Sequence, residues 1–581
     1  MLGSPLPATG LQKRSGAAFL FAYLLLLPAA AATAQSPGGD WSRPFQFDGP
    51  AVGDQAGTAV ASAGDVNNDG WDDVIVGMPE ADPNGRAQAG SAIVYSGMDG
   101  SVLLRIDGTG ARERLGTAVA GPGDLDGDGF DDLIVGAPLA DPFNTENAGI
   151  VVAVSGATGA QLWNVRGTDR DGNLGSSVAA LGDVDGDLIP DVAIGAPGNA
   201  PQLLRNAGAV AVVSGADGSL IRGFRGPASL ARFGFAVAGV GDLDRDGLPD
   251  LLVGAPTASP GGRSEAGSVY VLSPATGATI HEWHGEYAGI LLGFSVASAG
   301  DLNFDGFDEV IAGAPFAPAP PGGLMVGAAV IWGGRWGAVR NVLQTGASFD
   351  RFGWRVAGVG DANGDGFPDL AVAAPFVDGA GDDRGRVVLL AGDDLRVLNV
   401  FDGEGDKDTL GFGLGHGTPA PGGLARLFLG APRATRAGLT QAGTVRVEAY
   451  DPFLRTDAHG ISSAAGGSAT LAVDFPYTEA GAEYLLLATT SGAGVVSLGG
   501  LEIPLKPDAV FTMTRRNQYP PLFTNPRGTL DAGGNASIRF QLPPGGLSSY
   551  VGTLVHFAVI SYRPPATPGL SSGPVAVLIK S

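Results

Sequence analysis

An acidic segment recurs six times in this chain at an almost constant interval. Its copies begin at Asp65, Asp124, Asp183, Asp242, Asp301 and Asp361, which gives spacings of 59, 59, 59, 59 and 60 residues. Self-similarity at such a period indicates a repeat architecture, because each repeat is one supersecondary unit that buries its apolar face only against its neighbours. The chain is therefore expected to fold as an array of similar units.

Each copy has the composition of a cation-binding loop. In the copy that begins at Asp124, acids occupy positions 1, 3, 5 and 9, a glycine occupies position 6, and position 7 can offer a backbone carbonyl. Ca²⁺ takes six to eight oxygen ligands, and the glycine permits the sharp turn that directs them inward. The apolar run Leu133-Ile134-Val135 follows at once and predicts a buried strand. The pattern predicts a metal loop that leads into a strand.

We expect about six structural Ca²⁺ ions, each bound by the side chains at positions 1, 3, 5 and 9 and the carbonyl at position 7. The predicted ligands are Asp65, Asn67, Asp69, Trp71 and Asp73; Asp124, Asp126, Asp128, Phe130 and Asp132; Asp183, Asp185, Asp187, Ile189 and Asp191; Asp242, Asp244, Asp246, Leu248 and Asp250; Asp301, Asn303, Asp305, Phe307 and Glu309; Asp361, Asn363, Asp365, Phe367 and Asp369. Catalytic carboxylates are the alternative, but a hydrolase needs only two acids in one cleft and leaves the repeated spacing unexplained.

The loop that begins at Asp183 differs from the other five at position 6. It has Leu188 where the others have glycine. A left-handed backbone at that position costs a non-glycine residue about 1 kcal/mol. We therefore predict that this loop is the weakest of the six calcium sites.

The segments around each loop carry a resemblance to a known family. A glycine segment such as Phe233-Gly234 precedes each copy, and Gly-Ala-Pro or a near variant follows it. Together with the acids, these residues resemble the FG-GAP repeats of the N-terminal propeller of integrin α-subunits, over roughly residues 43 to 450. The resemblance implies that the metal loops lie on one face of a disc and that ligands bind at the opposite face.

Each repeat contains four predicted strands, which is the content of a propeller blade. In one repeat they are residues 115–120, 133–136, 150–154 and 161–165, and outer strands are also expected at 102–106, 220–224, 279–283 and 397–401. A seventh repeat begins at Leu410, but its ligand positions have become Thr418, Ala420, Gly422 and Arg426, so we expect no metal there. Its outer strand is missing and is predicted to come from residues 43–49. Pairing of the two chain ends would remove exposed sheet edges.

The predicted fold is all-β: a seven-bladed β-propeller of FG-GAP repeats, closed by N- and C-terminal strands and followed by a small antiparallel β-sandwich. Residues 1–34 are typical of a signal peptide, with Lys13 and Arg14 before an apolar run and Ala32-Thr33-Ala34 as a cleavage site. We expect the propeller over residues 41–453 and the sandwich over 460–581. Six sandwich strands are predicted, at 468–475, 483–490, 501–506, 537–542, 553–561 and 575–580. This tail is similar to a module of exported bacterial proteins.

Charge and composition exclude some functions. The net charge is −24, which disfavours nucleic acid as a partner because phosphate binding needs clustered Lys and Arg. No later stretch reaches 18 apolar residues, so no membrane span is expected. The chain has no cysteine, and its stability must come from the sheets and the ions.

We expect a secreted, extracellular or cell-envelope protein, monomeric and not an enzyme, that binds or adheres to an extracellular protein or glycan. Two alternatives are a polysaccharide lyase or other carbohydrate-active enzyme that uses the axial face, and a structural component of the cell envelope. A lyase would need His, Tyr, Arg or Lys converging on one pocket. The loops opposite the metal face carry Arg86, Arg205, Arg263, Arg384, Arg433 and Arg436, which are either a basic ring for an acidic ligand or solvated loop tips.

Overall fold

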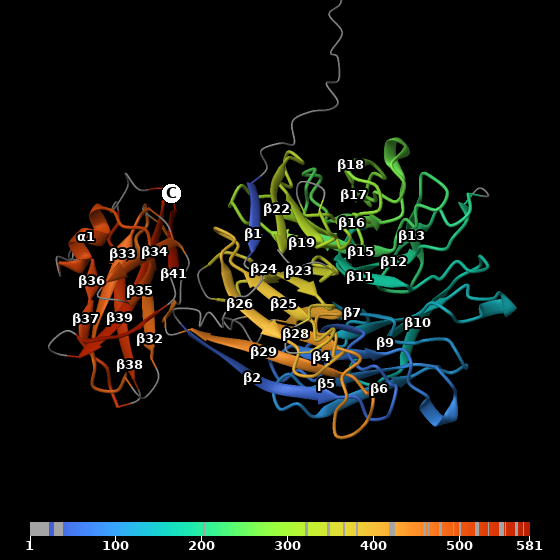
Figure 1. Cartoon of the computed structure of the whole chain (residues 1–581), viewed down its shortest axis with the longest axis horizontal. Helices are drawn as coiled ribbons and strands as arrows, with labels where there is room; N and C mark the ends of the chain where they lie inside the picture. Colours follow the sequence, from blue (N-terminus) through green and yellow to red (C-terminus); the bar gives the residue numbers. More distant parts are fainter. Residues whose placement is uncertain are drawn as a thin grey trace, which may run out of the picture.

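The computed structural model describes residues 23–27, 39–201, 204–319, 323–345, 349–363, 366–378, 381–417, 425–452, 454–456, 460–462, 464–475, 479–491, 493–498, 501–516, 522–532, 534–544, 551, 553–563, 567–572 and 575–580. Figure 1 shows a large body that contains strands β2 to β29 and a smaller β-rich body beside it. Among these residues no helix combines the length and the apolar character needed to cross a membrane. Of the predicted signal peptide, residues 1–22 and 28–34 lie outside the described ranges.

The described residues of the large body form seven sheets of the propeller type, each with four antiparallel strands in radial order. From the inner to the outer strand, the first six are β3 (Ala59–Gly64), β4 (Asp73–Met78), β5 (Ser91–Tyr95), β6 (Val102–Asp107); β7 (Ala118–Gly123), β8 (Asp132–Ala137), β9 (Ile150–Val154), β10 (Gln161–Arg166); β11 (Ser177–Gly182), β12 (Asp191–Ala196), β13 (Ala209–Val213), β14 (Leu220–Arg225); β15 (Ala236–Val240), β16 (Asp250–Ala255), β17 (Ser268–Leu272), β18 (Thr279–His284); β19 (Ser295–Gly300), β20 (Glu309–Ala314), β21 (Ala328–Trp332), β22 (Val339–Thr345); and β23 (Arg355–Gly360), β24 (Asp369–Ala374), β25 (Arg386–Leu390), β26 (Val397–Asp402).

The seventh sheet closes the ring in the predicted way. It runs β27 (Gly413–Gly417), β28 (Arg426–Ala431), β29 (Thr444–Pro452) and then β2 (Gly39–Asp48), which comes from the other end of the chain. Phe47 of β2 stacks on Tyr95 of the first blade at 4.1 Å between ring centroids. Each inner strand contacts the inner strand of the next blade, and β27 contacts β3. The predicted closure by the two chain ends is confirmed.

The sequence explains why the blades stack so closely. The second strand of each of the first six blades is buried along its whole length, which confirms the predicted apolar strand. A Cβ placed on Gly136, the glycine of Gly-Ala-Pro, would lie 2.2 Å from the carbonyl oxygen of Gly175 in the next blade. The Phe-Gly and Gly-Ala-Pro segments are therefore the two sides of one backbone contact between neighbouring blades, where a side chain has no room.

The first strand of each blade begins later than the sequence pattern suggests. In the second blade it begins at Ala118, three residues after the predicted start. Gly116 has φ +88°, and Leu115 forms an isolated bridge with Gly90 of the preceding blade. The glycine segment is therefore a junction between blades rather than part of the strand. The structure also contains a strand that the sequence did not predict. This strand, β1 (Tyr23–Leu27), pairs in parallel with the outer strand β22.

The smaller body consists of two main sheets. Their strands are β30 (Leu454–Thr456), β31 (Gly460–Ser462), β32 (Gly467–Asp474), β33 (Glu483–Thr489), β36 (Phe523–Thr524), β37 (Arg527–Thr529), β38 (Asn535–Leu542), β39 (Leu554–Arg563), β40 (Thr567–Ser571) and β41 (Val575–Lys580); β34 (Ala493–Leu498) and β35 (Leu501–Leu505) form a separate hairpin. One sheet runs β30-β32-β38-β36 and the other β31-β41-β39-β33-β37, with β40 on β39. All six predicted strands are present, and the pairing is antiparallel except for β31 with β41.

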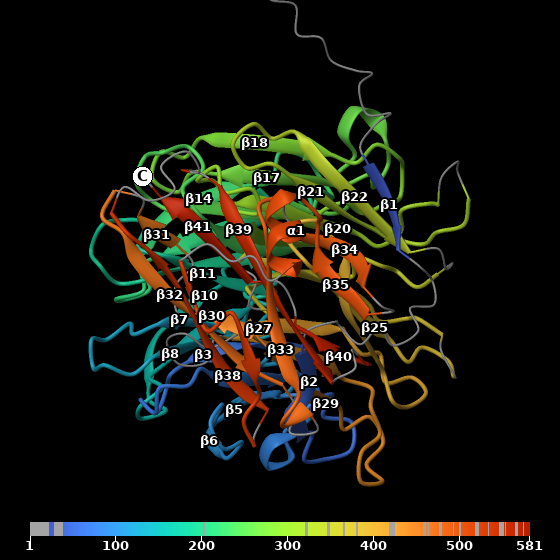
Figure 2. The ribbon, with the colours of Figure 1, turned by 90° about the vertical axis from the view of Figure 1, so that its left-hand side faces the viewer.

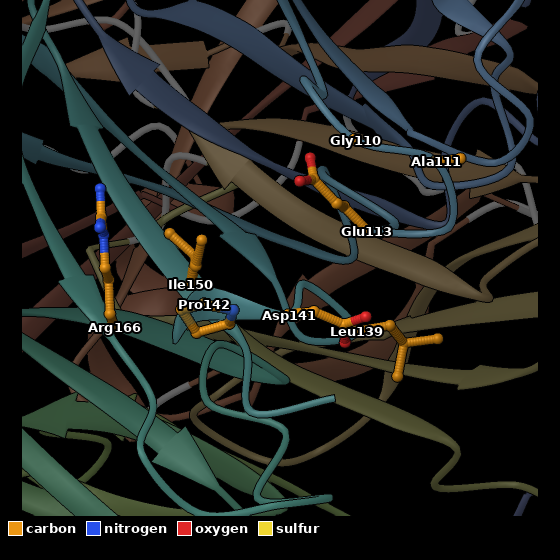
Figure 3. A pocket seen from close by; sticks show the side chains of 8 residues that line it. All are labelled: Gly110, Ala111, Glu113, Leu139, Asp141, Pro142, Ile150 and Arg166. Carbon is orange, nitrogen blue, oxygen red and sulfur yellow. The ribbon is translucent and has the colours of Figure 1, made fainter. Parts of the chain in front are cut away.

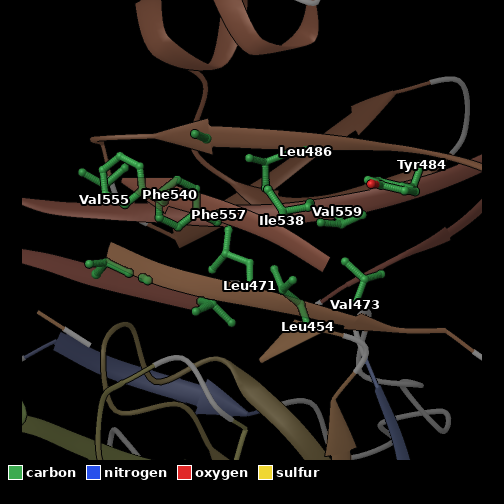
Figure 4. Close-up of a cluster of buried hydrophobic side chains, with 14 of the residues drawn as sticks. Leu454, Leu471, Val473, Tyr484, Leu486, Ile538, Phe540, Val555, Phe557 and Val559 are labelled. Atoms are coloured by element: carbon green, nitrogen blue, oxygen red, sulfur yellow. The ribbon is translucent and has the colours of Figure 1, made fainter. Parts of the chain in front are cut away.

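The core of this sandwich lies between the two sheets. Leu471 and Ile538 from one sheet and Leu486, Phe557 and Val559 from the other belong to a single buried cluster (Figure 4). The helix α1 (Ala509–Arg515) was not predicted. It begins after Asp508, whose carboxylate accepts a hydrogen bond from the backbone N–H of Phe511, so an N-cap aspartate was the available sequence signal.

Candidate metal centre

The six acidic loops occupy the same place in six blades. Each connects the inner strand to the second strand, and the acid at position 9 is the first residue of that second strand. The loops therefore lie together on one face of the disc, the face at which the inner strands end. We call it the loop face, and we call the other the open face.

The acid at position 1 shapes the turn. One of its carboxylate oxygens accepts the backbone N–H of position 6 in every loop, at 2.8–2.9 Å, from Gly70, Gly129, Leu188, Gly247, Gly306 and Gly366. The glycines at this position have φ between +85° and +92°. Leu188 follows the same turn, with φ +72° and 89% of the residue exposed. The loop at Asp183 therefore bears the left-handed backbone expected for it, without any burial of the leucine side chain to offset the cost.

The acid at position 9 is the buried member of each set. Asp73, Asp132, Asp191, Asp250, Glu309 and Asp369 are all 0% exposed. In the first loop Asp73 accepts the backbone N–H of Val66 at 3.0 Å and that of Gly97 at 2.9 Å. These bonds join the loop to the turn between the third and fourth strands. The same pair of bonds recurs at Asp132 and Asp191.

Burial disfavours the charged form of these acids. It raises the pKa of Asp73 and Asp250 to about 7 and that of Asp132 and Asp191 to about 6, against the hydrogen bonds from backbone amides, which lower it. The other carboxylates of each loop add to the rise. A bound cation would remove this cost, because an opposite charge at short distance favours the ionised carboxylate.

Three of the loops bring three carboxylates together within reach of one ion. In each of them one oxygen from every acid lies within 4.8 Å of the others: Asp124, Asp126 and Asp132; Asp183, Asp185 and Asp191; Asp242, Asp244 and Asp246. In the third, Oδ1 of Asp250 is buried without a hydrogen-bond partner. A buried, unpartnered carboxylate oxygen beside further acids fits a hard cation with oxygen ligands. These clusters can hold a metal ion.

The backbone carbonyl at position 7 is a predicted calcium ligand in each loop. The structure shows the hydrogen bond that fixes the backbone at this position. The backbone N–H of Trp71, Phe130, Ile189, Leu248 and Phe307 donates to the position 5 carboxylate at 2.8–3.1 Å. Position 3 is an amide in the remaining loops, Asn67, Asn303 and Asn363. Asp365, at position 5 of the sixth loop, lies outside the described residues.

The fifth loop has a feature that the spacing did not reveal. Its position 9 residue is Glu309, and Nη1 of Arg340 on β22 lies 3.3 Å from one carboxylate oxygen. The amide Nδ2 of Asn303 donates to the other oxygen at 2.7 Å. Even so, burial raises the pKa of Glu309 to about 7. A protein cation therefore shares this carboxylate, which lowers the charge left for a metal ion.

A further set of acids links neighbouring loops. Asp131, at position 8 of the second loop, accepts the backbone N–H of Asp65 in the first loop at 2.7 Å. Asp308 of the fifth loop accepts the N–H of Gly241 at 3.2 Å. Sequence reasoning missed this role, although the doubled acid at positions 8 and 9 was the available signal.

In the seventh blade a basic residue stands where the other six blades have the position 9 acid. Arg426 begins its second strand, where the other six blades have Asp or Glu, and its guanidinium lies 4.4 Å from the ring centroid of Trp71 in the first loop. A positive charge at this position agrees with the predicted absence of a metal there. Residues 418–424, which include Thr418, Ala420 and Gly422, lie outside the described residues.

The sandwich packs against the loop face. His556 of β39 stacks on Phe367 of the sixth loop, with ring centroids 6.3 Å apart. Burial, together with the charges of Lys506 and Arg396, lowers the pKa of His556 to about 4. Figure 2 shows the sandwich strands in front of the blades. The open face has no such contact with the sandwich among these residues.

Most of the predicted basic ring on the open face is engaged within the protein. The Nε atoms of Arg86, Arg263 and Arg384 donate to the carbonyls of Gly108, Gly285 and Gly403, the same bond in three blades. Arg436 pairs with Asp408 at 3.0 Å. These arginines are therefore structural supports of the loops.

A pocket of about 370 Å³ opens on the same face, between the first and second blades (Figure 3). Glu113, Leu139, Asp141, Ile150 and Arg166 line it, and Figure 3 shows the carboxylates of Glu113 and Asp141 on separate loops. Its lining mixes both signs of charge and does not by itself select a ligand.

Comparison with known proteins agrees with the propeller fold and its six acidic loops. A sequence profile of the FG-GAP repeat matches residues 56–95, 115–154, 174–213, 233–272, 292–332 and 352–390, the six blades with acidic loops. The chain is similar to integrin alpha-5 of Xenopus laevis, with 33% identity over 265 residues, 41% of this chain and 23% of that protein. It is also similar to integrin alpha-V of Gallus gallus, with 32% identity over 214 residues, 34% of this chain and 20% of that protein. Integrin alpha-PS2 of Drosophila melanogaster is 32% identical over 215 residues, 33% of this chain and 14% of that protein. The matches thus span less than a quarter of these relatives.

Proposed function

Because the chain carries an FG-GAP, integrin-α-like β-propeller, we propose that it is a secreted, calcium-loaded binding protein and not an enzyme. Its ligand, an extracellular protein or glycan, binds to the open face. The observation that carries this proposal is the separation of roles between the two faces. One face holds six equivalent acidic loops and the docked sandwich, and the other holds the free ends of the blades.

Calcium has a structural role in this proposal. The ion neutralises carboxylates that would otherwise repel one another, and it holds the hairpin between the inner and second strands. The chemistry of the donor set supports calcium, because the side chains at the ligand positions of all six loops offer only carboxylate or amide oxygens. Six sites would each add to stability by linkage, by about 2.7 kcal/mol when calcium exceeds its Kd a hundredfold.

We propose that the chain is exported and acts as a monomer with two folded parts. Residues 1–34 have the composition of a signal peptide, and a chain without cysteine that is stabilised by calcium suits the calcium-rich extracellular space. We assign residues 41–453 to the propeller and 460–581 to the sandwich.

Binding is favoured over lyase chemistry by the residues at the axis. Among the described residues, the rings that lie directly before the inner strands, Phe235, Phe294, Trp354 and Phe412, have no Tyr or His in ring contact. His416 lies next to the last residue of β27, Gly417, and therefore toward the loop face instead. An enzyme that abstracts a proton from a sugar needs such a base within hydrogen-bond reach.

Two measurements test the proposal. Elemental analysis and melting with and without EDTA test the calcium: we expect bound calcium and a large fall in Tm after its removal. A Tm indifferent to EDTA, in protein that contains no calcium, would refute the structural role. Binding to glycan and extracellular-protein arrays, combined with depolymerisation assays on the same glycans, tests the rest, and turnover of any array glycan would contradict a purely binding function.

A further inference from the structure

Seven equivalent residues surround the axis on the open face. Each lies directly before an inner strand, and its backbone N–H donates to the carbonyl three residues earlier at 3.1–3.2 Å. They are Thr58, Thr117, Ser176, Phe235, Phe294, Trp354 and Phe412. Because the inner strands form a closed ring, these residues form a ring around its axis on the open face, which we call the axial mouth.

The rim is divided into two unlike halves. Blades one to three contribute small hydroxyl residues, whereas blades four to seven contribute aromatic rings. The rings of Phe235 and Phe294 are 5.0 Å apart, those of Phe294 and Trp354 4.5 Å, and those of Trp354 and Phe412 5.5 Å. All four rings are half-buried, so part of each reaches solvent. The axial mouth therefore offers a continuous aromatic arc and an arc of three hydroxyl groups, each of which donates to the backbone carbonyl three residues earlier at 2.7–2.8 Å and can only accept a further hydrogen bond.

Arg351 lies beside one ring of the aromatic arc, that of Trp354, and over two rings outside the arc, those of Phe316 and Phe376. Its guanidinium carbon is 4.5 Å from the ring centroid of Phe376, 5.0 Å from that of Phe316 and 5.7 Å from that of Trp354. The chain thus supplies its own cation to these rings, and a cation from outside would meet an occupied and positively charged surface. Stacking on a ring face leaves the edge of a guanidinium free for a planar anion.

Arg355 adds a second guanidinium in the same blade, four residues further along the chain. It is the first residue of β23, where the other inner strands begin with Ala, Ser or Gly. Its Nε donates to the carbonyl of Phe412 at 3.1 Å, and its two terminal nitrogens form no hydrogen bond within the described residues. Desolvation lowers its pKa, and no carboxylate opposes that effect.

The two guanidinium groups have no partner anion among the residues that the structure describes. Asp350 precedes Arg351 in the chain, but the cation that acts on it is Arg386. Elsewhere the protein is strongly acidic, with a net charge of −24. Two arginines of one blade without a partner carboxylate, on such an acidic protein, mark a place where a negative group is favoured.

We propose that the axial mouth binds an acidic saccharide, with carboxylates of its uronate residues held by Arg355 and by Arg351. This inference rests on the proposed binding function and specifies its ligand class. A pyranose ring has an apolar face of C–H groups and an edge of hydroxyl groups, so it matches a rim that is aromatic on one side and hydroxyl-bearing on the other. An acidic peptide would satisfy the arginines but has no comparable use for the hydroxyl arc.

The test compares three probes by calorimetry at one saturating calcium concentration. They are a tetragalacturonate, the same oligosaccharide with its carboxyl groups reduced to alcohols, and a tetraglutamate peptide. We expect binding of the tetragalacturonate alone, with a change in tryptophan fluorescence that the Trp354→Phe variant lacks. Equal binding of the reduced oligosaccharide would overturn the role of the carboxylate, and preferred binding of the peptide would overturn the saccharide.

Two variants test the arginines and one serves as a control. Arg355→Gln and Arg351→Gln should each lower the affinity for tetragalacturonate by about tenfold or more, since each removes a charge-assisted hydrogen bond. Arg114→Gln changes the residue equivalent to Arg351 in the second blade, where it pairs with Glu80 at 2.9 Å, and should leave the affinity unchanged. The hydrogen bond of Arg351 within the described residues uses its backbone carbonyl, which Arg351→Gln keeps, so this variant stays informative if Arg355→Gln unfolds.

The outcomes separate this inference from the proposed function. If an array ligand binds and neither arginine variant weakens it, the binding function stands and the axial mouth is not its site. If no acidic saccharide binds, the inference is wrong whatever the arrays show. If the arrays also show no ligand of any kind, the proposed function fails as well.

Discussion

The substitution Asp250→Asn in the fourth loop tests the structural role of calcium. It should raise the stability of the protein without calcium and lower it, relative to the wild type, with calcium. The carboxylate of Asp250 is fully buried, Oδ2 accepts the N–H of Leu243 at 2.8 Å, and Oδ1 has no partner. In Asp250→Asn the amide oxygen can keep the bond to Leu243. The new N–H₂ group replaces the unpartnered oxygen and faces the acids of the same loop, which raise the pKa of Asp250.

The expected effect without calcium follows from the pKa. Desolvation raises the pKa of Asp250 from 3.8 to about 7, which at about 1.4 kcal/mol per unit makes the charged form unfavourable by up to about 4 kcal/mol. The folded state therefore binds more protons than the unfolded state between pH 4 and pH 7, and stability falls as pH rises through this range. In EDTA at pH 8, Asp250→Asn should be more stable than the wild type by about 1–4 kcal/mol, and the gain should vanish near pH 4.

Calcium should reverse the order of stability of the wild type and Asp250→Asn. The wild type gains about 2.7 kcal/mol at this site at a hundredfold excess over Kd, whereas the variant has lost a ligand and gains little there. Urea unfolding of both proteins, in EDTA and in calcium, at pH 4.5 and pH 8, measures the free energy of unfolding of each protein under all four conditions. Asp244→Asn is the matched control, because position 3 is exposed and is already an amide in the loops with Asn67 and Asn303. If Asp250→Asn is destabilised equally in EDTA and in calcium, the buried carboxylate is a structural acceptor and the reasoning fails.

Three further variants test other parts of the molecule. Leu188→Gly should raise the calcium affinity of the Asp183 loop alone, up to about fivefold, because it removes about 1 kcal/mol of left-handed strain at an exposed residue; unchanged affinity in calorimetry would show that the strain is independent of the ion. Arg340→Gln should raise calcium affinity at the fifth loop by removing the cation 3.3 Å from Glu309, whereas a lower affinity would mean that Arg340 positions this ligand. A chain that begins at residue 51 lacks β2 and leaves β29 as an open edge, so light scattering should show aggregation and Tm should fall relative to a chain that begins at residue 35; equal behaviour of the two would place ring closure elsewhere.

Much of the fold could be predicted from the sequence because the information was local and repeated. Strand positions, acid spacing and the position 6 glycine are set within one blade of about 59 residues, and the repetition confirms each element six times. The missing outer strand of the last blade also followed from local content, since only the N-terminal segment was left to supply it. One departure in the blades, the later start of the inner strands at residues such as Ala118, arose because Gly116 belongs to a contact between blades.

The tertiary structure alone decided which side chains meet across blades and bodies. Glu309 and Arg340 lie on different strands of one blade, Asp131 reaches Asp65 in the blade before it, and Arg351 lies over rings from two blades. Such contacts depend on the rotation between blades, on strand register and on the rotamer of a long side chain. None of these features produces a recognisable residue spacing in the sequence. Closure of the inner strands into a ring is the physical reason that rim residues about 59 positions apart, such as Phe294 and Trp354, share one surface.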